Sequence, residues 1–150
     1  MMGAWTGQIL RVNLSKGTTT KEPLDAKRAR AYIGGRGLAT RYLTDEIDPK
    51  VDPLGPDNKV IIATGPLTGT NAPTGGRYMV VTKSPLTGAI ACSNSGGYVA
   101  PEIKGCGYDF IILEGKAASP VYLWLHNDAV EVRPADTVWG KTVHDSEDFL

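Results

Sequence analysis

The stretch "GPLTGTNAPTGGRYMVVTKSPLTGAIACSNSGGYVAP", residues 65–101, carries the strongest pattern in this chain. The tetrapeptide PLTG occurs twice within it, at residues 66–69 and 85–88. Each copy is followed by a pair of glycines, and the first pair runs directly into Arg77. The pattern sets two glycine-paired turns and one arginine around an apolar segment.

Two runs of β-branched or apolar residues, 78–82 and 89–92, lie between these turns and are predicted to be strands. If they pair as a hairpin through residues 84–87, both glycine pairs lie at the same end of one sheet. A single ligand could then contact both turns.

Glycine reaches positive φ without strain, and successive backbone amides in such turns form a nest that binds anions. The first turn adds a guanidinium that can grip phosphate in a bidentate fork. The second adds an amide and a hydroxyl before an expected short helix over 97–104. These turns supply the candidate cofactor-binding residues Gly75, Gly76, Arg77, Asn94, Ser95 and Gly96.

Two simpler interpretations stay open at this point: the glycine pairs are plain turns, and the two PLTG copies are ordinary proline-initiated turns. Glycine pairs are usually plain turns, and neither segment matches a dinucleotide fingerprint or a phosphate-binding P-loop. A third glycine-rich segment, residues 34–37, is favoured as a helix–helix connector over a binding loop.

The remaining pattern favours an α+β fold, because runs of strands are broken by short helices without regular alternation. A helix is expected over 26–33, capped by Asp25 and ended by the glycines at 34–35. The other expected elements are helices at 38–47 and 143–150, and strands at 9–14, 18–22, 60–63, 110–113, 121–125 and 129–132. The final helix has no stop signal, so the chain is interpreted as a piece of something longer.

Composition narrows the function classes. Sixteen basic and sixteen acidic residues cancel, which argues against a nucleic-acid partner, and no apolar run is long enough for a membrane span. The two cysteines, Cys92 and Cys106, are too few for a disulfide scaffold, so a cytoplasmic location is expected. Both are predicted to be packed thiols rather than cluster ligands.

Taken together, several segments resemble the tungsten-containing aldehyde:ferredoxin oxidoreductases. The match is most specific over residues 63–98 and extends to shorter segments at 5–14, 34–38, 107–109, 113–116 and 139–141. The resemblance implies that residues 1–150 form an incomplete N-terminal tungstopterin-binding domain. It implies an α+β fold with two β-sheets related by a pseudo-twofold duplication, with the later helical domains missing.

The resemblance also implies the chemistry of the complete protein. Such enzymes oxidise aldehydes to carboxylic acids and pass the electrons to ferredoxin. They use tungsten held by two pterins, a [4Fe–4S] cluster whose ligands would lie outside this chain, and Mg²⁺ between the pterin phosphates. By position, Arg77 lies between cluster and pterin, Asn94 and Gly96 bind pterin, and the Asn94 carbonyl contacts Mg²⁺.

The chain alone is expected to be inactive, because it lacks the cluster cysteines and the substrate pocket. Two alternatives stay open. One is an enzyme of the same family with another substrate, such as an acyl-CoA or a sugar-phosphate aldehyde, and the other is a non-catalytic scaffold or phosphate-binding domain. Tungsten could also be replaced by molybdenum, and ferredoxin by another electron-transfer subunit.

Overall fold

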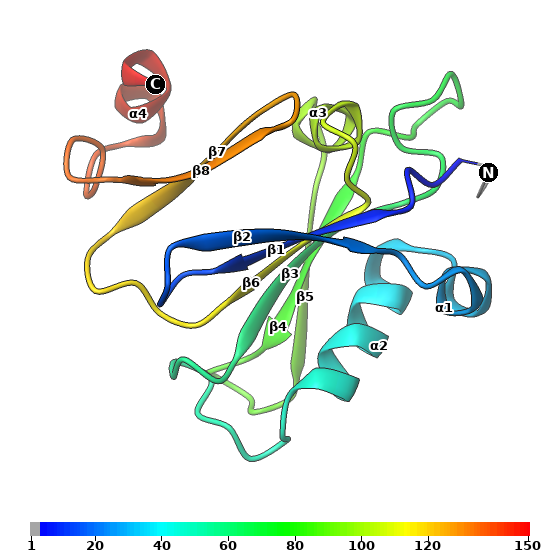
Figure 1. Ribbon diagram of the computed structural model, residues 1–150, viewed down its shortest axis with the longest axis horizontal. Helices are drawn as coiled ribbons and strands as arrows, with labels where there is room; N and C mark the ends of the chain where they lie inside the picture. Colours follow the sequence, from blue (N-terminus) through cyan, green and yellow to red (C-terminus); the bar gives the residue numbers. More distant parts are fainter. Residues whose placement is uncertain (1–3) are drawn as a thin grey trace.

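A computed structural model describes residues 4–150, which form a six-stranded sheet and a separate two-stranded sheet with short helices (Figure 1). The strands are β1 (Gln8–Asn13), β2 (Thr18–Pro23), β3 (Lys59–Thr64), β4 (Tyr78–Lys83), β5 (Ile90–Ser95), β6 (Phe110–Glu114), β7 (Val121–His126) and β8 (Ala129–Pro134). The helices are α1 (Ala26–Tyr32), α2 (Gly35–Glu46), α3 (Val99–Gly105) and α4 (Val143–Phe149). The α+β class with two sheets is therefore confirmed, and the pseudo-twofold relation between the sheets stays a prediction.

The large sheet is mixed, with the order β2-β1-β6-β3-β4-β5. Only the β1–β6 pair is parallel among these strands, and every other neighbouring pair is antiparallel. The expected hairpin between β4 and β5 is present, with Tyr78 opposite Ser95 and Lys83 opposite Ile90. β5 is the last strand at its edge within residues 4–150.

Helices α1 and α2 cover one face of the large sheet (Figure 1). Leu38 and Leu43 of α2 are fully buried against Ile61, Val81 and Phe110, which project from three neighbouring strands. Removing such side chains from water contributes about 1.5–3 kcal/mol each, so this apolar layer fixes α2 on the sheet.

The β7–β8 hairpin packs on the opposite face (Figure 1). Alternate residues of the hairpin point inward because successive strand side chains face opposite sides. These inward residues contact Leu10, Val12 and Ile111 of the large sheet, and they are Leu123, Leu125, Val130 and Val132. Among residues 4–150, no helix is long and apolar enough to cross a bilayer.

Several predicted boundaries shift in the structure. Ile33, not a glycine, takes the positive φ of 66° that ends α1, and α2 begins at Gly35 rather than at residue 38. The Asp25 cap is confirmed, since its carboxylate accepts from the backbone N–H groups of Lys27 and Arg28. The prediction that Cys92 is a packed thiol is wrong, because β5 is an edge strand that leaves Cys92 exposed.

One buried carboxylate ties the N-terminal segment to the sheet. Asp109 is 1% exposed and accepts hydrogen bonds from the backbone N–H groups of Thr6 and Gly7. The Lys104 ammonium at the end of α3 pairs with the same carboxylate at 2.5 Å. A buried charge with this many partners is stabilised, whereas removing one partner would be strongly destabilising.

A second charged network joins strands that are distant in sequence. The Arg11 guanidinium contacts Glu22, Glu46 and Glu114, and Lys59 contacts the last two of these. Burial would raise the pKa of Glu46, but hydrogen bonds from Arg11 and Lys59 outweigh it and lower that pKa below its ordinary value. The pKa of Glu114 is lowered by the same balance.

We therefore expect a pH dependence of stability that Glu46→Gln reduces. The pKa of a glutamate in the unfolded chain is about 4.3. A carboxylate whose pKa is lower than this in the folded state stabilises the fold at higher pH, and the stabilisation is lost as the pH falls through the folded-state pKa. At about pH 7 the variant should be less stable by about 1–2 kcal/mol. Urea unfolding at pH values from neutral into the acid range measures both effects. If the free energy of unfolding of Glu46→Gln falls with pH as steeply as that of the unmodified protein, the lowered pKa of Glu46 does not stabilise the fold.

Candidate functional site

The β4–β5 register brings the two predicted turns together. Tyr78 lies opposite Ser95, so the next step along the hairpin places Arg77 opposite Gly96. A Cβ built on Gly96 would lie 3.6 Å from the Arg77 Nε atom. The arginine side chain therefore crosses directly over Gly96, at a distance where a Cβ would make ordinary van der Waals contact with the guanidinium.

The Arg77 guanidinium has a neutral partner. Its Nη1 group donates a hydrogen bond to the Asn94 side-chain oxygen, while the Asn94 amide contacts the Met79 sulfur at 3.3 Å. No carboxylate lies within ion-pair distance of Arg77 among residues 4–150. The site therefore keeps an uncompensated positive charge, which favours an anionic ligand.

The first glycine pair is packed against backbone. A Cβ on Gly75 would lie 2.8 Å from the Leu67 carbonyl oxygen, closer than real side chains approach. A Cβ on Gly76 would lie 3.1 Å from the Gly97 carbonyl oxygen, so the two predicted turns touch each other. Any side chain at Gly75 would push the Arg77 segment out of place.

A hollow of about 330 Å³ opens beside this contact. Its wall is mainly apolar, from Ile33, Leu67 and Met79, with Arg77 as its charged group. The size falls within the range of small-molecule sites, which combine apolar walls with a few polar groups.

The third glycine segment, residues 34–37, also reaches this hollow. Its interpretation as a helix–helix connector holds only for Gly34, because residues 35–37 form the first turn of α2. Gly35 in addition lines the hollow, and a Cβ on Gly34 would lie 3.1 Å from Pro66. The sequence pattern gave no reason to place this connector beside Arg77.

Asn94 and Ser95 lie on β5 itself, rather than in the turn where they were predicted. Neighbouring strand residues face opposite sides, so the Ser95 side chain lies on the other face from Asn94, where its hydroxyl donates to the Gly96 carbonyl at 3.5 Å. Of the six predicted site residues, Gly75, Gly76, Arg77, Asn94 and Gly96 come together by side chain or close backbone contact, and the Ser95 side chain lies on the other face.

The backbone carbonyl of Asn94 faces the free edge of the sheet. The Ser84 N–H donates to the Ala89 carbonyl at the closed end of the hairpin, which makes that pair a hydrogen-bonded one. Bonded and non-bonded pairs alternate along an antiparallel ladder, so the pair of Met79 and Asn94 is non-bonded. The Asn94 carbonyl therefore points away from β4 and is available to a ligand.

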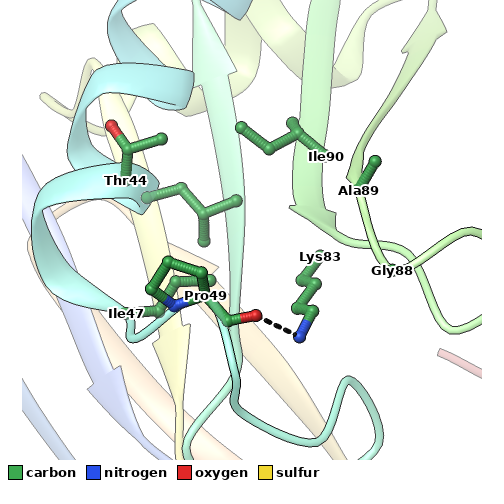
Figure 2. Close-up of a pocket in the computed structure, with 8 residues that line it drawn as sticks. Thr44, Ile47, Pro49, Lys83, Gly88, Ala89 and Ile90 are labelled. Carbon is green, nitrogen blue, oxygen red and sulfur yellow. Dashed lines mark hydrogen bonds between the residues drawn. The ribbon is translucent and has the colours of Figure 1, made fainter.

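Another hollow, of about 170 Å³, lies at the opposite end of β4 between the end of α2 and the hairpin turn (Figure 2). Its charged group is already engaged, because the Lys83 ammonium donates to the carbonyl oxygens of Pro49 and Val51. It is also smaller than typical ligand pockets. The Arg77 hollow is the better candidate for a ligand site.

These features define an α+β domain with a candidate anion site at Arg77. Residues 9–150 match the family described as aldehyde ferredoxin oxidoreductase, N-terminal domain. The chain belongs to this enzyme family.

Two curated relatives are oxidoreductases that differ in their substrates. The chain is 57% identical, over its whole length, to the tungsten-containing aldehyde ferredoxin oxidoreductase of Pyrococcus abyssi, and it covers 24% of that protein. It is 42% identical to the aliphatic sulfonate oxidoreductase, WOR-like subunit, of Pyrococcus furiosus, covering 93% of this chain and 22% of the relative. The chain thus spans about a quarter of the length of these curated relatives.

A solved structure has the same fold. The active-site complex BamBC of benzoyl coenzyme A reductase, in complex with 1,5 dienoyl-CoA, is 40% identical with a TM-score of 0.95. The match covers 97% of this chain and 22% of that one.

The packing at Gly75 leads to a stability prediction. Gly75→Ala should lower the free energy of unfolding by about 1–3 kcal/mol, because the new methyl group meets the Leu67 carbonyl. Gly105→Ala is the matched control, since a Cβ there meets nothing within 4 Å and alanine favours the helix. Urea denaturation compares the two, and equal stability of both variants would show that Gly75 is not constrained by packing.

Proposed function

We propose that the Arg77 hollow and the two glycine turns hold the phosphorylated pterin part of a tungsten bis-pterin cofactor. We further propose that the complete protein is a tungsten-dependent aldehyde:ferredoxin oxidoreductase. The observation that carries this proposal is the Arg77 guanidinium, which lies over Gly96 and whose hydrogen-bond partner within residues 4–150 is a neutral amide. The family and the tungsten-containing relatives support the identity of the ligand.

The residues present fit such a group. A pterin phosphate needs a cation and backbone donors, which Arg77 and the turn at Gly75 and Gly76 can supply. A flat ring system needs an apolar wall, and Leu67 and Met79 provide one in the hollow. The outward carbonyl of Asn94 is an oxygen donor of the kind that Mg²⁺ prefers.

When bound, the tungsten centre supplies the two-electron oxidation of an aldehyde and water to a carboxylic acid. The role of this chain is to bind and orient the cofactor and to set its electrostatic surroundings. Arg77 neutralises anionic charge at the pterin, and the Asn94 side chain orients the guanidinium through its hydrogen bond. The [4Fe–4S] cluster ligands and the aldehyde pocket would lie in the remaining domains, with ferredoxin as the electron partner and the cytoplasm as the location.

A second candidate is an enzyme of the same family with another substrate. The sulfonate oxidoreductase and the benzoyl coenzyme A reductase complex favour it, because both resemble this chain closely while their names specify other substrates. Assays of the full-length protein with aldehydes, sulfonates and acyl-CoA thioesters, each with reduced or oxidised ferredoxin, distinguish these cases.

Replacing Arg77 tests the proposal. In the full-length protein, Arg77→Ala should lower the tungsten and pterin content per polypeptide about tenfold or more, because a charge-assisted bond to the cofactor is lost. Arg133→Ala is the control, since that arginine lies on β8 and pairs with Glu131. Elemental analysis for tungsten, molybdenum and iron measures the outcome. Full tungsten content in Arg77→Ala would contradict the proposed role, and unmodified protein without metal would favour the scaffold alternative.

A further inference from the structure

The two PLTG copies have identical sequences and very different surroundings. In the first copy, Thr68 is only 4% exposed. The second copy forms the tip of the β4–β5 hairpin, where the corresponding Thr87 is exposed. The difference arises from the fold and gives each copy its own role.

The threonine hydroxyls bond to different partners. The Thr68 hydroxyl accepts from the Gly65 N–H at 3.1 Å and donates to the Arg77 carbonyl at 3.4 Å. The Thr87 hydroxyl accepts from the Ala89 N–H at 3.3 Å, which keeps it within its own turn. Of the two, only Thr68 reaches the segment that carries the site arginine.

Three neighbours hold the first PLTG turn in place. The Leu67 carbonyl lies against Gly75, and Pro66 lies against Gly34 at the start of α2. A Cβ on Gly69 would lie 3.3 Å from the Lys104 side chain, so α3 closes the third side. The turn is wedged between α2, α3 and the Gly75 segment, and it cannot shift without moving them.

We infer that Thr68 is a positioning residue, which fixes the Arg77 backbone so that the guanidinium lies over Gly96 and beside Asn94. The inference rests on the proposed function where it concerns the bound cofactor, and on geometry alone where it concerns Arg77. Without the hydroxyl, the Arg77 carbonyl loses its donor and the Gly65 N–H is left without its acceptor. The Arg77 segment then gains freedom, and the guanidinium leaves its position for part of the time.

The repeated motif provides a matched pair of variants, Thr68→Val and Thr87→Val, in the full-length protein. We expect Thr68→Val to release tungsten up to about tenfold faster than the unmodified protein, because the Thr68 hydroxyl bonds to both the Gly65 N–H and the Arg77 carbonyl are lost. In Thr68→Val we also expect faster hydrogen–deuterium exchange of the backbone amides in a peptide that covers residues 75–77, measured with and without cofactor. Thr87→Val should change neither quantity.

Two further variants separate positioning from general destabilisation. Thr68→Ser keeps the hydroxyl and should restore slow exchange and slow tungsten release. In an Arg77→Ala background, Thr68→Val should have no additional effect on tungsten release, because the group it positions is gone. This background also keeps the test decisive if Thr68→Val is less stable overall.

The outcomes distinguish this inference from the proposed function. Equal exchange at residues 75–77 in Thr68→Val and Thr87→Val overturns the positioning role, whether or not cofactor is bound. Tungsten release that depends on Arg77 but not on Thr68 overturns it while leaving the proposed function intact. Rapid exchange in Thr68→Val in a protein that carries no tungsten or pterin supports the positioning role and refutes the proposed cofactor.

Discussion

Arg77 lies across the end of the β4–β5 hairpin, with Gly96 opposite it and the Asn94 side-chain oxygen accepting its hydrogen bond. The hairpin register decides this pairing, and the buried layer between α2 and the sheet holds the register, with Val81 fully buried in it. A slip of one residue would turn Val81 to the other face and move Arg77 away from Gly96. The candidate site thus depends on the same packing that stabilises the domain.

The basic residues that stabilise the fold are paired with carboxylates, whereas, within the described part of the chain, the arginine of the candidate site is not. Arg11 makes ion pairs with three carboxylates, and Lys104 is buried against Asp109. The Arg11 network joins strands to α2, the Lys104–Asp109 pair ties α3 to the N-terminal segment, and both keep little charge for a ligand. Arg77 bonds a neutral amide at an exposed sheet end, where its charge remains available. This contrast supports a binding role for Arg77 more strongly than its position beside two glycines does.

Much of the site could be predicted from the sequence, because its signals are local. Glycine pairs next to an arginine indicate an anion nest, and two apolar runs around a short turn predict the hairpin that joins the turns. Thr68 could not be found in this way, since its contact with Arg77 depends on how the chain folds back between them. Tertiary packing also decides that Gly35, at the start of α2, lines the hollow beside Arg77. It likewise decides that β5 is an edge strand, so the sequence did not predict that Cys92 is exposed.

A crystal structure of the full-length protein with its bound cofactor tests the central claim most directly. The account predicts an anionic group of the pterin within hydrogen-bond distance of the Arg77 guanidinium, with the Asn94 carbonyl directed at a cation on the free edge of β5. A pterin bound elsewhere, with Arg77 facing solvent or a carboxylate from a later domain, would contradict it.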